Sequence, residues 1–168
     1  MKQVLLIART ELKRNLESPI SLVFLGGFLI SSYLAFFNHG RFFARNIADL
    51  RPLFDSLPLL MIWVVSALAM RGWAEEQQRG QSEHLFSLPV PIHHWVMGRF
   101  YGGLGLIAIA LIGTLPLAVT AGLTGSVDWG PVFCGYFGAL LVGATYLSLG
   151  LCLSAATAHQ MVALMGTA

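Results

Sequence analysis

The chain has 168 residues, of which 56% are hydrophobic and 11% are charged, and its formal net charge is +2. Ordinary soluble domains carry about 25% charged residues, and a soluble chain of this length could not bury so much apolar surface. The composition excludes a soluble globular protein and predicts an all-α, polytopic membrane protein.

Residues 1–18 precede the first long apolar run and carry an amphipathic pattern. Leu5, Ala8, Leu12 and Leu16 follow helical spacing, whereas the cationic side chains fall on other faces. Such a helix can lie in the headgroup layer with its cations on anionic lipid. We therefore expect an interfacial helix at the N-terminus, next to the lipid bilayer.

Two membrane spans are predicted in the first half of the chain. Ser18 is a candidate N-cap, and Pro19 suits the first position of a helix. The uncharged run 19–37 then has about the length needed to cross a bilayer. The second span, 54–72, has a shorter uncharged core, and Arg71 can reach the headgroup layer from its end.

The second half of the chain predicts two more spans, at 102–121 and 131–154. Residues 156–168 are also apolar, but about ten to thirteen residues cannot cross a bilayer. We interpret them as the start of a fifth span in a chain that is a fragment of a longer protein. Small residues at four-residue spacing predict close helix packing in the first and fourth spans; they are Gly27, Ser31 and Ala35, and Gly135, Ala139 and Gly143.

Basic residues predict the orientation of the spans. The N-terminal stretch holds four of them, and the region after the second span holds Arg71, Arg79 and Arg99. The loop after the first span holds three, and the loop after the third holds none. Because Lys and Arg favour the cytoplasmic side, we expect the N-terminus and residues 73–99 on the cytoplasmic side of the inner membrane.

The most polar part of the chain is MRGWAEEQQRGQSEHLFSLPVP, residues 70–91. Glu75 and Arg79 are spaced as a favourable helical pair, and Gly80 suits a helix end. Ser82 can cap a new short helix, with Glu83 in its first turn. The pattern indicates a helix extension, a turn and a short second helix.

The short second helix ends at Pro89 and presents Leu85, Phe86 and Leu88, which it is too small to bury by itself. It would suit the binding of another protein. The alternative is a solvated loop with no partner.

The same region resembles the ABC-2 type transporter permeases. The family pattern has an Arg, an aromatic residue and A-E-E-x-x-x-G-T-x-E-x-L-L-x-x-P, followed by an apolar lead into Gly-Lys. Gln81 replaces the Thr, His84 replaces an apolar residue, and Gly98-Arg99 replaces Gly-Lys. The residues that fit are Arg71, Ala74, Glu75, Glu76, Gly80, Glu83, Leu85 and Pro89.

The upstream sequence LRPLFDSLPLLMIWVVSALAMR and the early ESPI are similar to the gliding-motility and nitrous-oxide-maturation branch of that family. Its members normally have six spans, which agrees with a C-terminally truncated chain.

The resemblance implies a permease subunit that works as a homo- or heterodimer with a second permease subunit and with separate ABC ATPase subunits. It makes residues 73–99 a coupling loop, with an ATPase contact at Glu83, Leu85 and Phe86. Glu75 and Glu76 would brace the entry helix of this loop. Gly80 and Pro89 belong to the same predicted contact segment.

No catalytic, metal-binding or cofactor-binding residues are predicted. A phosphate-binding loop needs Gly-Lys-Ser/Thr, but Lys2 precedes Gln and Lys13 precedes Arg. Any ATP would therefore be used by a partner subunit, and the chain itself is not expected to be an enzyme.

Adjacent His93 and His94 point about 100° apart on a helix and make a poor chelate. His159 stands among apolar residues, and it is either a functional group within a span or part of a turn.

Nucleic-acid binding has no support, since the basic residues lie on both membrane faces. The alternative function is a membrane scaffold or assembly factor that transports nothing and binds a partner through residues 73–99.

Overall fold

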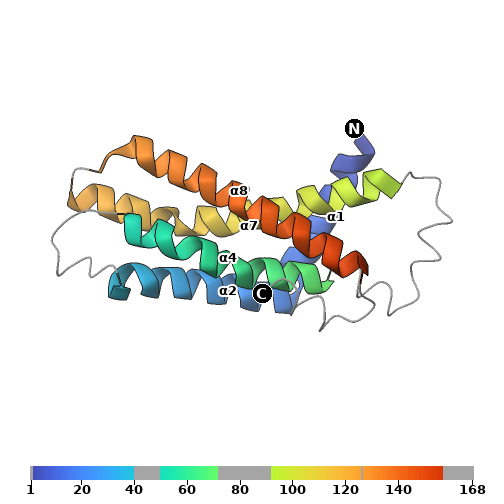
Figure 1. The fold of residues 1–168 in the computed structure, drawn as a ribbon, viewed down its shortest axis with the longest axis horizontal. Helices are drawn as coiled ribbons and strands as arrows, with labels where there is room; N and C mark the ends of the chain where they lie inside the picture. Colours follow the sequence, from blue (N-terminus) through green and yellow to red (C-terminus); the bar gives the residue numbers. More distant parts are fainter. Residues whose placement is uncertain (1, 40–49, 72–91, 126, 157–168) are drawn as a thin grey trace.

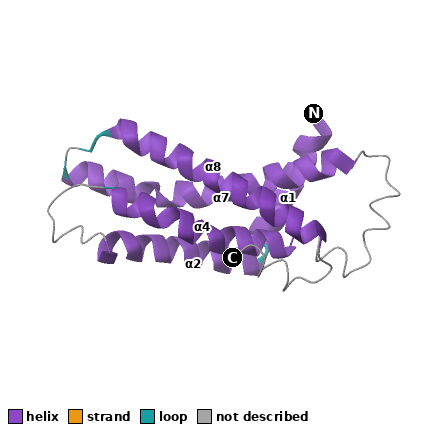
Figure 2. Cartoon of the chain, viewed as in Figure 1, coloured by secondary structure: helices purple, strands orange, loops and turns teal. Residues whose placement is uncertain are grey.

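The computed structural model describes residues 2–39, 50–71, 92–125 and 127–156, and within these ranges the chain is helical with short connections and no strand (Figure 2). The predictions for residues 156–168 fall almost wholly outside this part of the chain. The helices are α1 (Lys2–Glu17), α2 (Pro19–Leu34), the π-helix η1 (Ala35–His39), α4 (Arg51–Arg71), α7 (Ile92–Thr124) and α8 (Trp129–Ala156).

Helices α2, α4, α7 and α8 form an elongated bundle in which successive helices run in opposite directions, and α1 crosses the bundle near one end (Figure 1). Helix α4 packs against α2 and α8, and α7 packs against α1, α2 and α8. The same end of the bundle contains the start of α2, the end of α4, the start of α7 and the end of α8 (Figure 1). Residues 72–91 therefore join two helices at the end where α1 lies.

The break between α1 and α2 is a single residue, Ser18. Its backbone is extended, with φ −82° and ψ 125°, and Pro19 follows as the first residue of α2. The predicted cap position is thus correct, but the Ser18 side chain makes no capping hydrogen bond. Proline fixes its own φ and disfavours the α conformation in the residue before it. These two effects allow α1 and α2 to point in different directions.

Helix α4 supplies the centre of the core. Leu53, Leu57, Met61 and Val64 are each 1% exposed or less and recur every three or four residues, so one face of α4 is completely covered. Leu106 and Ile107 of α7 and Leu147 of α8 belong to the same buried cluster.

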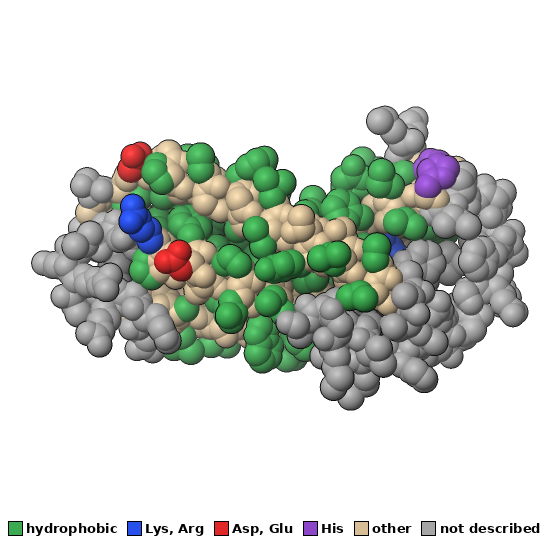
Figure 3. All heavy atoms as spheres, viewed as in Figure 1, with side chains coloured by type: hydrophobic (Ala, Val, Ile, Leu, Met, Phe, Trp, Pro, Cys, Tyr) green, Lys and Arg blue, Asp and Glu red, His purple; other side chains and the backbone are tan. Residues whose placement is uncertain are grey.

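Three of the described helices are long and apolar enough to cross a membrane: Pro19–Phe37, His93–Leu123 and Trp129–Ser154. Figure 3 shows hydrophobic side chains along the middle of the bundle, with acidic, basic and histidine side chains toward its ends. The chain is a multi-pass membrane protein. The count of four spans and part of a fifth stays a prediction, although α4 lies alongside the three apolar helices (Figure 1).

The two small-residue patterns have different environments. A Cβ atom added at Gly135 would lie 2.7 Å from the Phe54 ring, and one at Gly143 would lie 2.9 Å from Ile107 Cγ2. The pattern in α8 therefore serves packing inside the chain. By contrast, a Cβ atom at Gly27 would meet nothing within 4 Å. Gly27 and Ser31, the two members of this pattern in α2, line an open groove beside Trp63.

Candidate functional site

The predicted contact residues Glu75, Glu76, Gly80, Glu83, Leu85, Phe86 and Pro89 all lie outside the described residues, and so does Arg79. The structure describes both ends of the segment that carries them, which are Arg71 at the end of α4 and Ile92 at the start of α7. Helix α7 begins ten residues before the predicted span at 102–121, so His93, His94 and Arg99 are helical rather than part of a loop. The candidate site is therefore built from the helix ends that hold residues 72–91.

Helix α1 lies against the first turns of α7, and glycines make this close approach possible. A Cβ atom at Gly98 would lie 2.5 Å from Ile7 Cγ2, and one at Gly102 would lie 2.7 Å from Glu11 Cβ. At Gly105 the nearest atom is Leu12 Cδ1, at 3.3 Å. The three glycines share one face of α7 at spacings of four and three residues, which is the spacing that lets helix backbones approach.

Only part of the apolar stripe predicted for residues 1–18 takes part in this contact. Leu5 is 74% exposed, whereas Leu12 packs against the core and the Ala8 carbonyl faces Gly102. Polar Asn15 is also buried. The helix therefore docks on protein along one face and leaves the side chains of Leu5 and Arg9 exposed on others.

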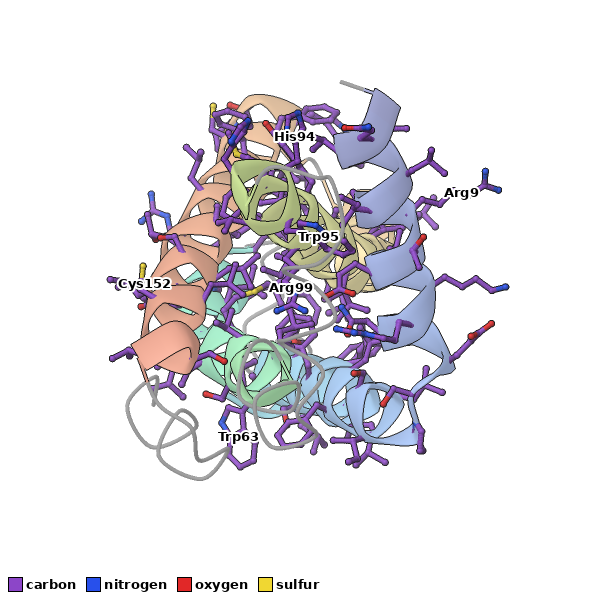
Figure 4. All side chains as sticks on the ribbon, turned by 90° about the vertical axis from the view of Figure 1, so that its right-hand side faces the viewer. Arg9, Trp63, His94, Trp95, Arg99 and Cys152 are labelled. Atoms are coloured by element: carbon purple, nitrogen blue, oxygen red, sulfur yellow. The ribbon has the colours of Figure 1, made fainter. Side chains whose placement is uncertain are left out.

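Arg99 is the charged residue at the centre of the site. Its side chain is only 4% exposed, and its Nε lies 3.3 Å from Glu11 Oε1. The same carboxylate oxygen accepts a 2.7 Å hydrogen bond from Arg14 Nη2. Figure 4 shows Arg99 among the helices at this end of the bundle, while Arg9 of α1 projects away from them. A buried guanidinium requires such a partner, because an isolated buried charge is very costly.

A small cavity of about 20 Å³ adjoins this ion pair. A cavity of about 10–15 Å³ or more can hold one water molecule if polar groups surround it, and here Glu11, Arg14, Asn15 and Arg99 supply them. The remaining lining comes from Gly103 of α7, Leu68 of α4, and Leu147 and Leu151 of α8. Four helices thus meet around Glu11, Asn15 and Arg99, a cluster that we call the buried polar point.

The sequence contained a signal for this site that its interpretation missed. Arg99 was assigned to the loop, and Glu11 was given no role. Yet Arg99 directly precedes a long apolar run, where a charged side chain needs a partner. Glu11 is one of two acids in the first 17 residues. Their pairing could not be read from spacing, because it joins segments 88 positions apart.

A second hollow lies between α7 and α8 near their connection, and it has a different character. It has a volume of about 580 Å³ and is lined almost entirely by apolar side chains, such as Leu111, Leu115, Phe133 and Phe137. Tyr136 contributes its polar group, since its hydroxyl accepts a 3.2 Å hydrogen bond from Thr114 Oγ1. Among the described residues, no charged side chain lines this hollow.

Metal ligands do not gather anywhere in the described part of the chain: it contains no group of three or more His, Cys, Asp and Glu side chains that could hold a metal ion. The His93 and His94 rings lie 4.3 Å apart with planes inclined at 37°. His84 and His159 lie outside the described residues.

Residues 5–168 match the family model described as "ABC-2 family transporter protein". A search of curated proteins finds no match to this chain. The family match covers nearly the whole chain, including α1 from Leu5 onward and the buried polar point. It does not distinguish branches of the family, so the similarity to the gliding-motility and nitrous-oxide-maturation branch stays a prediction.

Proposed function

Because the chain belongs to the ABC-2 family of transporter proteins, we propose that it is the permease subunit of an ABC transporter. A separate ATPase subunit binds residues 73–99 from the cytoplasm and uses the ATP. A second permease subunit completes the membrane part, in the inner membrane and with the N-terminus in the cytoplasm. The observation that carries this proposal is the family match over residues 5–168, together with helices that can cross a membrane.

The arrangement of the helices supports a coupling role for residues 72–91. Helix α4 enters this segment after Arg71, and α7 leaves it at Ile92. A displacement of the segment therefore acts directly on two helices of the bundle. The ATPase subunit needs only a few kcal/mol of differential contact between two states to shift the permease from one to the other.

The test is the co-purification of an ATPase subunit with the tagged protein, taken from membranes in mild detergent. Leu85→Glu should abolish it, because the substitution places a charge on the predicted apolar contact. Gln78→Glu, which adds the same charge elsewhere in the segment, is the matched control and should retain the ATPase subunit.

Two outcomes would contradict the proposal. If wild-type protein yields no ATPase subunit under conditions that preserve known complexes, the scaffold alternative is favoured. If Leu85→Glu retains the ATPase subunit as well as Gln78→Glu does, the predicted contact is wrong.

A further inference from the structure

The buried polar point lies within about two helical turns of the two helix ends that flank residues 72–91. Arg99 is seven residues after Ile92, which is about two helical turns, and Leu68 is three residues before Arg71. Both residues line the cavity that also contacts Glu11 of α1. A displacement of the end of α4 or of the start of α7 would therefore act on α1 through residues that line one shared cavity.

Shape and charge together bind α1 to α7. Gly98 and Gly102 flank Arg99 in sequence and leave no room for a Cβ atom beneath Ile7 and Glu11. The ion pair between Arg99 and Glu11 adds a polar contact in surroundings where both charges are largely removed from water. Separating the helices would leave the Arg99 charge buried without this partner, which is strongly unfavourable.

The connection from α1 to α2 is of the opposite kind. Only Ser18 separates them, and it has an extended backbone rather than a helical one. Its buried hydroxyl has no hydrogen-bond partner among the described residues. A change in the backbone angles at one such residue can reorient a helix, as in hinges at element ends.

We propose that Arg99 is a positioning residue: its ion pair with Glu11 makes α1 and the first turns of α7 one unit, so that displacement of residues 72–91 swings α1 about Ser18 relative to α2. This inference rests on the proposed permease function. It assigns α1 a moving role in the transport cycle, in addition to contact with the membrane surface.

The experiment measures the distance between α1 and α2 in the complex of permease and ATPase subunits. Spin labels replace the exposed Lys13 and Val23 in a chain whose Cys134 and Cys152 are changed to Ser, and the labelled chains are diluted with unlabelled ones. Pulsed electron paramagnetic resonance compares the nucleotide-free complex with one trapped with ATP. The expected shift of the distance is about 2 Å or more, the scale of helix shifts in switching proteins.

The informative variant is the double substitution Glu11→Met with Arg99→Met. Removing both charges avoids leaving one of them buried alone, which protects the fold. We expect the ATPase subunit to remain bound while the nucleotide-dependent shift is lost. Glu11→Gln alone should reduce the nucleotide-dependent shift, and it replaces the double variant in the experiment if the double variant does not fold. Arg99→Lys, which keeps the charge, should retain the shift. Arg9→Met, which removes an exposed cation of α1, should leave the shift unchanged.

The outcomes separate this inference from the proposed function. Wild-type protein without an ATPase subunit contradicts the proposed function. An intact complex whose distance does not respond to nucleotide overturns the inference alone, and so does a double variant that shifts as the wild type does. Loss of the ATPase subunit from the double variant would also overturn it, since the pair would then support binding rather than transmission.

Discussion

Single glycines determine where α1 can dock. The backbones of α1 and α7 approach so closely that a Cβ atom at Gly102 would lie 2.7 Å from Glu11 Cβ and 3.0 Å from the Ala8 carbonyl oxygen. Both atoms lie close to the backbone of α1 and cannot move aside without moving the helix. The placement of Glu11 beside Arg99 therefore depends on the missing side chain at position 102.

Gly102→Ala should lower the unfolding temperature of the purified protein in detergent. Overpacking typically costs about 1–3 kcal/mol, which exceeds the roughly 0.5–1 kcal/mol that alanine gains over glycine within a helix. The control is Gly138→Ala in α8, where an added Cβ atom meets nothing within 4 Å, and it should leave the unfolding temperature equal or higher. Equal effects of the two substitutions would show that α1 does not dock closely on α7.

Whole helices follow from the sequence better than their contacts do. Pro19 begins α2, and α8 covers the predicted span 131–154, because long apolar runs and helix-start signals are local features. The docking of α1 is not local, since it depends on glycines about ninety residues further along the chain. Arg99 was missed for the same reason, because its ion-pair partner, Glu11, lies on α1. The predicted contact residues at 75–89 remain a prediction.

Helix α4 shows how packing can hold a helix within an apolar bundle. In lipid, helix association depends on van der Waals packing and on hydrogen bonds, because the surroundings are as apolar as the side chains. The covered face of α4 makes such contacts with two neighbouring helices. Its exposed face includes Leu59 and Trp63, which are 66% and 62% exposed.

Met61→Ala should destabilise the bundle, whereas Leu59→Ala should have little effect. Met61 is fully buried, so its truncation leaves a cavity. In water-soluble cores such a change costs about 2–5 kcal/mol, including the loss of transfer energy; in a bilayer we expect only the packing part of that cost. Denaturant titration in mixed micelles, followed by helix content, measures the difference. A larger loss for Leu59→Ala would mean that the outer face of α4 carries the packing in the assembled protein.

At the scale of the whole molecule, the alternating directions of the helices separate the end that holds α1 from the end that holds the connection between α7 and α8. Helix α1 and both ends of residues 72–91 share one end of the bundle, and the connection between α7 and α8 lies at the other (Figure 1). Among the basic residues that the structure describes, six belong to the end with α1, and Arg51, at the start of α4, belongs to the other; the six are Lys2, Arg9, Lys13, Arg14, Arg71 and Arg99. The excess of basic residues at that end predicts that it faces the cytoplasm.

Cysteine labelling from the two sides of the membrane tests this orientation. In a chain without Cys134 and Cys152, Glu83→Cys should react with a membrane-impermeant maleimide only in inverted vesicles, because the ATPase subunit can reach residues 73–99 only from the cytoplasm. Asp128→Cys, which replaces an exposed residue between α7 and α8, should react only in intact cells. The reverse pattern would place α1 and residues 72–91 outside the cell, where no ATP-driven subunit could act on them. Labelling of both positions from one side would require an even number of crossings between them, which contradicts a single crossing by the apolar helix α7 that lies there.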